Sequence, residues 1–360
     1  MDVITIKKQI KLVDMTMSPG QMFIFNQSQS HQFRQMLINS RLEKHATITP
    51  IDKELPRFSP ESKAKRVLII RSGGIGDLLA LSSLSHYLVS ELGRNVTFVT
   101  QKKYFPLFYW FQSYNSLIDF KTPAGINNIR QKFNPINFIN FEGKIEKSRE
   151  NWFHLFYENM DVDFAQWGSP KLFLPSRFPK SSPAKNKNSV LLSLTSTANI
   201  RSLELETVWR AIEPMTTKHK IFVHETNLRE NDHLFIKKMK PKRLKVIPAG
   251  GLSDYLLDLY FATNVISTDT AALHFREGVE KPAIGLFNAF ASEARSKYYT
   301  HTQSFDIKSN CPIQPCFQHC NRHDDLCPNF QGNKNIAPCF DHNINQELTQ
   351  QLTEIFQQHL

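Results

Sequence analysis

The stretch RVLIIRSGGIGDLLALSSL, residues 66–84, contains the pattern that decides the fold. Residues 67–70 are apolar without alternation, as in a buried parallel strand. A turn with Gly73, Gly74 and Gly76 follows, and an apolar helix pattern begins there. This order is typical of a strand–turn–helix unit with a ligand at the helix N-terminus. We therefore expect such a unit, with a binding site at its turn.

An acidic residue, Asp77, lies in this turn, where an anionic ligand would be expected. One interpretation is an N-cap for the following helix. The other is a general base that deprotonates a hydroxyl nucleophile. The glycine spacing matches neither a dinucleotide fingerprint nor a Walker A loop. On these residues alone, both interpretations of Asp77 stay open.

The composition limits the classes of partner. A net charge of +11 favours anionic ones, such as a phosphate-bearing ligand or an anionic membrane surface. Nucleic acid is not expected, because there is no zinc-finger spacing, RNA-binding aromatic signature or basic-region helix. The sequence has no apolar run long enough for a membrane span and no signal-peptide pattern at its start. We expect a cytoplasmic protein, peripheral at the inner membrane face where it contacts lipid.

The chain of 360 residues is long enough for two domains. Alternating strand and helix patterns begin at residue 66, and restart near residue 190 after a linker rich in proline, serine and lysine. The predicted fold class is α/β, with two doubly wound Rossmann-like domains facing a cleft. The predicted parts are a small N-terminal α+β appendage (1–58), the two domains (59–180 and 186–305), and a cysteine-rich loop with a closing helix (306–360).

Two further motifs carry polar residues at strand ends. In VISTDTAALHF, residues 265–275, Asp269 and Thr270 start a helix, and His274 lies one turn further on. Thr270 and the first amides could hold a phosphate oxygen, although an ordinary N-cap explains an acid there as well.

The other motif is LSLTSTANIRSLELETVW, residues 192–209. Thr195, Ser196 and Thr197 are followed by the cationic Arg201. Hydroxyl donors and one cation would suit a diphosphate. An exposed Ser/Thr loop is the alternative.

Together, these three stretches and residues 252–288 resemble the ADP-heptose:lipopolysaccharide heptosyltransferase family, including its autotransporter heptosyltransferases. The resemblance covers roughly residues 66–288, and the motifs follow the family's order. It implies a GT-B fold and inverting sugar transfer that needs no metal for the chemistry. The acceptor would bind mainly to the first domain and the nucleotide sugar to the second.

The resemblance also implies roles for particular residues. Asp77 would be the catalytic base, with Gly73, Gly74 and Gly76 making room for the acceptor. Donor-binding roles fall on the positions Thr195, Ser196, Thr197, Arg201, Glu225, Asp269, Thr270, Ala271 and His274. Arg201 stands where a lysine is usual, and Ala271 replaces a glycine, which puts the identity of the donor in doubt.

All five cysteines fall late in the chain, at Cys311, Cys316, Cys320, Cys327 and Cys339. No pair has the C-x-x-C spacing of a zinc knuckle. Four of the five could still hold a structural zinc or iron ion. Autotransporter relatives bind iron through theirs. Reduced thiols and disulfides are the other possibilities.

The expected activity is transfer of a sugar, heptose from ADP-heptose, to a saccharide, glycolipid or protein hydroxyl. One alternative is a non-catalytic module of the same fold that binds sugar nucleotides or glycans. Another is an assembly protein stabilised by a metal at its cysteines.

Overall fold

The structure is a computed structural model. It describes residues 2–11, 16–17, 22–25, 27–50, 57–119, 136–142, 144, 150–176, 182–311, 314, 337–341 and 345–360. The chain divides into two compact units. The first comprises Met1–Gly74, Leu84–Lys147 and Asn159–Asp161, and the second comprises Ile75–Ser83, Ser148–Glu158 and Val162–Leu360. The predicted domain boundaries and the cleft between the domains stay predictions.

The first unit begins with a small antiparallel sheet in the order β4-β1-β5. Its strands are β1 (Asp2–Ile6), β4 (Met22–Phe25) and β5 (Ala46–Pro50), while β2 (Ile10–Lys11) pairs with β3 (Thr16–Met17). Helix α1 (Gln27–Asn39) and the 3-10 helix η1 (Glu43–His45) complete this part. Phe33 and Leu37 of α1 pack with Ile4 and Ile6 of β1 in a core of their own.

A four-stranded parallel sheet follows in the order β8-β7-β6-β9. Its strands are β6 (Arg66–Ile70), β7 (Asn95–Thr100), β8 (Ser116–Asp119) and β9 (Ile136–Asn140), with the 3-10 helix η2 (Lys102–Trp110) between β7 and β8. Residues 67–70 are fully buried, as their unbroken apolar pattern predicts. The expected strand–turn–helix unit is therefore present.

The turn after β6 leads into α3 (Ile75–Ser90). The N-cap of this helix is Gly74, whose φ of 82° lies in the left-handed region that favours glycine. Asp77 is the third residue of the helix, so its interpretation as the N-cap is wrong. An acid in the first helical turn is still favourable, because the helix dipole is positive there.

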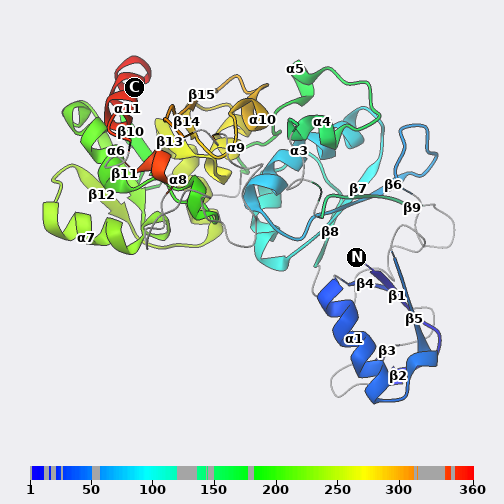
Figure 1. Ribbon diagram of the computed structural model, residues 1–360. Coiled ribbons are helices and arrows are strands. Elements are labelled where there is room, and N and C mark those ends of the chain that lie inside the picture. Colours follow the sequence, from blue (N-terminus) through cyan, green and yellow to red (C-terminus); the bar gives the residue numbers. More distant parts are fainter. Residues whose placement is uncertain are drawn as a thin grey trace. The chain divides into compact units, whose positions relative to one another are not determined.

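The second unit contains a six-stranded parallel sheet in the order β12-β11-β10-β13-β14-β15 (Figure 1). Its strands are β10 (Ser189–Ser193), β11 (Lys220–His224), β12 (Leu244–Ile247), β13 (Asn264–Thr268), β14 (Ala283–Phe287) and β15 (Thr302–Asp306). In chain order this is 3-2-1-4-5-6, the strand order of the dinucleotide-binding Rossmann fold.

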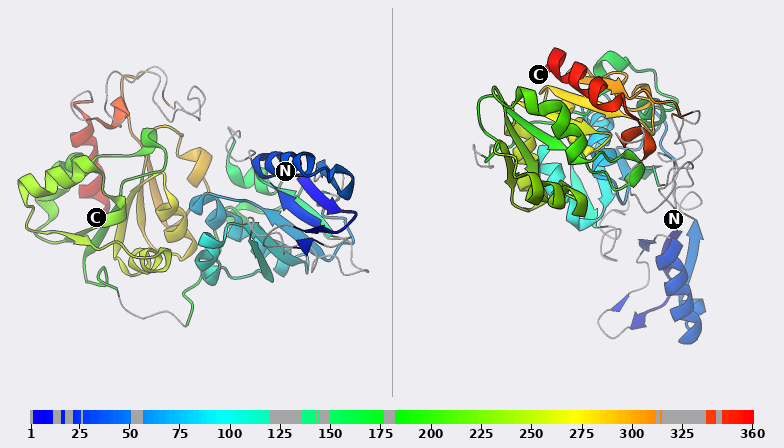
Figure 2. Two further views of the ribbon diagram at one scale, coloured as in Figure 1. Left: turned by 90° about the horizontal axis from the view of Figure 1, so that it is seen from below. Right: turned by 60° about the vertical axis from the view of Figure 1, so that its left-hand side comes forward.

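Helices cover both faces of this sheet (Figure 2). The helices of the unit are α4 (Trp152–Phe156), α5 (Phe164–Trp167), α6 (Leu205–Ile212), α7 (Glu230–Met239), α8 (Leu252–Phe261), α9 (Ala271–Gly278), α10 (Glu293–Ser296) and α11 (Leu348–His359). Helix α6 contacts α7 and α11, whereas α8 contacts α9. The chain runs across the sheet in one direction from β10 to β12 and in the other direction from β12 to β15. Right-handed crossovers that run in opposite directions place their helices on opposite faces.

The closing helix that the sequence predicts is α11, and it packs on α6. Leu348, Leu352 and Phe356 of α11 are fully buried in the core that includes Val208 and Ile212 of α6. In the described part of the chain, none of the helices is long and apolar enough to cross a membrane.

One buried arginine holds the end of α8 against the sheet. Arg276 of α9 has no exposed surface. Its guanidinium donates to the carbonyl oxygens of Leu259, Ala262, Thr263 and Pro282 at 2.8, 2.9, 2.9 and 2.6 Å. The last carbonyls of a helix have no partner within it, so Arg276 supplies the partners that the end of α8 needs.

We predict that Arg276→Met lowers the free energy of unfolding by about 3 kcal/mol or more, because several buried carbonyls lose a charged donor. Urea denaturation measures the change. The matched control is Arg210→Met, which removes an exposed i,i+4 pair with Glu206 and should cost no more than about 0.5 kcal/mol. A loss below about 1 kcal/mol for Arg276→Met would contradict the capping role.

Candidate active site

The polar residues of two predicted motifs meet at the carboxyl edge of the six-stranded sheet. Strands β10 and β13 are parallel neighbours, with Ser193 opposite Ser267. The helices that follow them lie on opposite faces of the sheet, so this is its topological switch point. The segment containing Thr195, Ser196 and Thr197 leaves β10 here, and Asp269 leaves β13 beside it.

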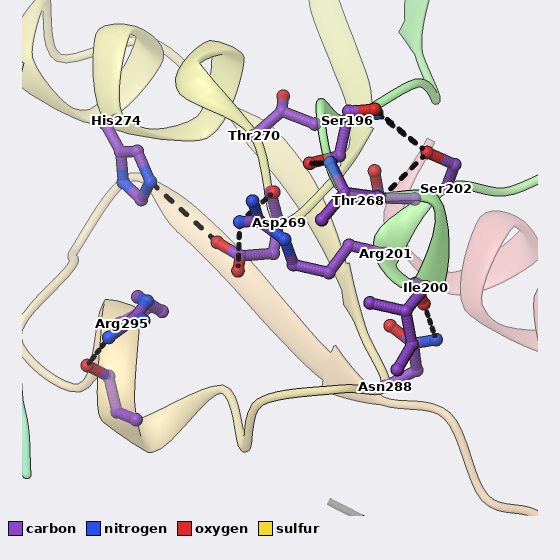
Figure 3. A network of polar contacts seen from close by, with 12 residues as sticks. Ser196, Ile200, Arg201, Ser202, Thr268, Asp269, Thr270, His274, Asn288 and Arg295 are labelled. Atoms are coloured by element: carbon purple, nitrogen blue, oxygen red, sulfur yellow. Dashed lines mark hydrogen bonds and ion pairs between the residues drawn. The ribbon is translucent and has the colours of Figure 1, made fainter. Parts of the chain in front are cut away.

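Asp269 is the centre of this cluster (Figure 3). Its carboxylate is 3.0 Å from Nη1 of Arg201 and 3.9 Å from Nε2 of His274. Arg201 also donates to the backbone oxygen of Asp269 at 3.2 Å. Burial alone would raise the pKa of Asp269, but the charges of Arg201 and Arg295 outweigh it and lower that pKa. Asp269 is therefore a buried carboxylate that stays ionised.

His274 is buried next to this carboxylate and is neutral. Burial lowers the pKa of His274 to about 3, although the negative charge of Asp269 acts to raise it. Its Nδ1 is 2.8 Å from the hydroxyl of Tyr299, whose own pKa is raised well above its usual value by burial. A hydroxyl that keeps its proton can donate to Nδ1. The imidazole proton then lies on Nε2, the nitrogen that faces Asp269.

Thr270 caps helix α9, besides the phosphate-binding role that the sequence predicts for it. It is the N-cap of α9, and its Oγ1 accepts from the amide of Ala272 at 3.2 Å. The same hydroxyl bonds to Ser267 at 2.7 Å, and it lies 3.5 Å from Ser193, which bonds to Tyr255. These hydroxyls fix where α9 begins, and with it the direction in which its first amides point.

Two of the three predicted diphosphate hydroxyls are engaged with protein groups, one within its own loop and one with η5 (Glu225–Asn227). Thr195 donates to the carbonyl oxygen of Asn227 at 2.6 Å, and Oγ of Ser196 accepts from the amide of Ala198 at 3.3 Å. Thr197 is exposed. These bonds shape the loop that ends in η3 (Asn199–Arg201), and so they place Arg201 against Asp269.

Asp77 lies in the same compact unit as this cluster, and Gly76 packs directly on it. A Cβ at Gly76 would be 2.9 Å from Cδ2 of His274 and 3.6 Å from Cα of Ala271. This position therefore needs glycine in order to pack against α9, besides any role with an acceptor. The charge of Asp77 acts on Arg295, whose pKa it raises against the larger effect of burial.

Glu225 has a different setting. It begins the 3-10 helix η5 (Glu225–Asn227) after β11, and it is exposed. Its carboxylate accepts from the amide of Ala249 at 2.8 Å. No bond from Glu225 to Arg201 or Asp269 is present among the described residues. The end of the second strand is where Rossmann folds place the acid that binds a ribose, so its position still suits that prediction.

Two residues of this cluster were missed by the sequence patterns, Arg295 and Trp152. Arg295 is 5% exposed, and its guanidinium carbon lies 3.8 Å from the ring centre of Phe290 and 5.1 Å from that of Trp152. The Trp152 ring also contacts His274, with centres 4.5 Å apart. Neither residue stands in a periodic or glycine-marked motif, so no signal in the sequence singles them out.

Three of the predicted metal ligands, Cys316, Cys320 and Cys327, lie outside the described residues. Cys339 is buried, and its Sγ accepts from Nδ2 of Asn288 at 3.4 Å. The same amide group donates to the carbonyl oxygen of Ile200 at 2.7 Å (Figure 3). The described residues include no group of three or more His, Cys, Asp or Glu side chains placed to hold a metal ion.

Comparisons with solved structures support the fold. The glycosyl transferase family 9 protein from Veillonella parvula is 13% identical, with a TM-score of 0.53, over 69% of this chain and 88% of that one. The iron-containing dodecameric glycosyltransferase TibC from enterotoxigenic E. coli is 11% identical, with a TM-score of 0.51, over 81% of this chain and 77% of that one. A second structure of TibC, described as a dodecameric iron-containing heptosyltransferase in complex with ADP-D-beta-D-heptose, is 10% identical, with a TM-score of 0.50, over 86% of this chain and 82% of that one.

No protein-family model matches the sequence, and no curated protein matches it either. At these identities the likeness concerns the fold. The predicted α/β class, with two parallel sheets as in these glycosyltransferases, is confirmed.

We predict that His274 makes the protein sensitive to acid. In the unfolded chain a histidine takes up its proton near pH 6.5, whereas the folded His274 does so only near pH 3. Acidification between these values therefore favours the unfolded state, by up to about 1.4 kcal/mol for each pH unit. From pH 6.5 to pH 4.5, His274→Gln should lose about 2 kcal/mol less stability than the wild type in urea denaturation. Parallel losses in the two proteins would contradict a neutral His274.

We also predict near-stoichiometric zinc or iron in the purified full chain, since four thiolates suffice for either metal. Elemental analysis measures it. The control is the Cys320→Ser, Cys327→Ser double variant, which should lose the metal. A metal-free wild-type protein would reject the site.

Proposed function

We propose that this chain is an inverting glycosyltransferase with Asp77 as its general base. The donor is a nucleotide sugar, ADP-heptose, and the acceptor is a hydroxyl of a saccharide, glycolipid or protein. The proposal is supported by the fold, which is that of glycosyltransferases, and by one feature of the site. That feature is the presence of Asp77 in the same compact unit as a buried cluster of two arginines and Asp269.

This arrangement suits the chemistry of inverting transfer. The acceptor oxygen attacks the anomeric carbon while its proton passes to the carboxylate of Asp77. The bond from the anomeric carbon to the diphosphate breaks, and its electron pair leaves with the diphosphate. Preorganised cations are the groups that stabilise such developing charge. Arg201 would serve here, oriented by Asp269, which neutralises only one of the two arginine charges.

The donor side fits the six-stranded sheet. Its strand order is that of dinucleotide-binding folds, which hold a ligand at the switch point. The amides at the N-terminus of α9 would face a phosphate, and Glu225 would bind the ribose. TibC, one of the similar structures, was solved with ADP-D-beta-D-heptose.

The acceptor is a neutral hydroxyl, and a phosphorylated glycolipid at a membrane face would suit the net positive charge.

A binding module of the same fold is the competing function. Such a module needs the nucleotide site but no base. Asp77 therefore separates the two, because its removal should abolish transfer and leave donor binding intact. The Asp77 variant below tests this difference.

We predict that Asp77→Asn lowers the rate of ADP release from ADP-heptose, with a core saccharide, glycolipid or protein acceptor, by about 10²–10⁴-fold. Its affinity for ADP, measured by calorimetry, should stay within about threefold, because the general base acts on the acceptor. The control is Asp161→Asn, an exposed acid, which should keep full activity.

Unchanged turnover in Asp77→Asn would overturn the assigned base. A thermal-shift comparison of the wild type with ADP-heptose, UDP-sugars and GDP-sugars tests the donor. Stabilisation by UDP- or GDP-sugars alone would replace ADP-heptose with another nucleotide sugar.

A further inference from the structure

A second buried cation, Arg295, lies beside the Arg201–Asp269 pair and lacks an ion-pair partner of its own. Among the described residues it forms no ion pair with a carboxylate, and its one hydrogen bond, to the carbonyl oxygen of Ala294, is long at 3.5 Å. In Figure 3, dashed lines join Asp269 to Arg201 and His274 but not to Arg295. A guanidinium carries five N–H donors, so most of the hydrogen-bonding capacity of Arg295 has no acceptor among the residues that the structure describes.

Among the described residues, no carboxylate lies in direct contact with the buried charge of Arg295. Asp269 is in direct contact with Arg201, at 3.0 Å, and His274 is neutral. Arg295 has only the more distant charges of Asp269 and Asp77, whose effect on its pKa is smaller than that of burial. Contact with the faces of Phe290 and Trp152 offsets only about 0.5–2 kcal/mol of the cost of burying it. An unpaired buried charge costs more than that, so a negatively charged ligand is the expected complement.

Trp152 provides a second and independent sign of a missing acceptor. Its side chain is 2% exposed, and its Nε1–H is buried without a hydrogen-bond partner among the described residues. The ring contacts both His274 and the guanidinium of Arg295. Buried N–H groups almost always have an acceptor, because leaving one unpaired costs about 1–3 kcal/mol.

We infer that Arg295 and Trp152 form an oxyanion-binding subsite that holds the diphosphate of the nucleotide-sugar donor. This inference rests on the proposed function and adds residues to it. When the bond between the anomeric carbon and the diphosphate breaks, the negative charge gained by the diphosphate falls on Arg295 and Arg201. The proton of the acceptor goes to Asp77, which becomes neutral.

The position of Arg295 favours the donor over an anionic acceptor. It lies in α10, which follows β14, the next strand to β13 in the sheet. Asn151 fixes the start of α4 to this helix, donating to the carbonyl oxygen of Glu293 at 2.9 Å and accepting from the amide of Phe153 at 3.0 Å. Trp152 and Arg295 are therefore held together at the carboxyl edge where α9 begins.

The test compares ligands with and without a diphosphate. Calorimetry measures ADP, adenosine and inorganic pyrophosphate binding to the wild type and to Arg295→Gln. We expect Arg295→Gln to weaken ADP and pyrophosphate binding by about ten- to a hundredfold and to leave adenosine within about threefold. Unchanged adenosine binding also shows that the variant is folded. Arg295→Lys keeps the charge but not the planar donors, so its loss should be smaller.

Two further variants complete the test. Trp152→Phe keeps the ring and removes the N–H, so it should weaken ADP binding by about three- to tenfold without changing adenosine binding. The matched control is Lys297→Gln, which removes an exposed positive charge near Arg295 that pairs with Glu293. It should leave ADP, adenosine and pyrophosphate binding unchanged.

The outcomes separate this inference from the proposed function. Equal ADP affinity in the wild type and Arg295→Gln would overturn the subsite and leave the glycosyltransferase proposal standing. Equal losses of ADP and adenosine binding would also overturn it, since they would reflect a structural role. A wild type that binds pyrophosphate through Arg295 but binds no ADP would retain the subsite and reject the donor. A wild type that binds neither ADP nor pyrophosphate would overturn both.

Discussion

The site depends on one buried carboxylate. Asp269 pairs with Arg201 in the loop after β10 and contacts His274 on α9. It therefore links the segments that follow the neighbouring strands β10 and β13. Burying a carboxylate is costly in solvation, and here Arg201 and His274 contact it while the charge of Arg295 acts on it from further away. A site whose geometry is fixed by such a network needs little rearrangement when a charged ligand arrives.

Local patterns were enough for most of the fold. The unbroken apolar strands β6, β10 and β14 and the helices α6 and α8 follow from periodicity and turn residues alone. Strands β1, β5 and β15 were not predicted, because β-pairing depends on partners far along the chain. The start of α3 was misplaced for a local reason, since the positive φ of Gly74 moves the N-cap three residues ahead of Asp77.

The sequence predicts the site residues that follow strand ends. It does not predict those in segments that carry no recognisable motif. Asp269, His274 and Arg201 follow β10 and β13, and the Rossmann order brings those ends together. The loop hydroxyls could not be assigned in advance, because their partners, such as the carbonyl oxygen of Asn227, are set by the folded loop. Arg295 and Trp152 lie far apart in the sequence, and the bond that helps to bring their helices together joins Asn151 and Glu293, which are 142 residues apart.

The amide of Asn288 has a consequence for the timing of folding during synthesis. It ties Ile200, next to Arg201, to Cys339, while α11 completes the core on α6. Domains generally fold as units while the chain is being made. The arginine loop therefore cannot reach its final form when its own strand leaves the ribosome. Some 140 residues must follow first, and the core around α6 is complete only when α11 has been made.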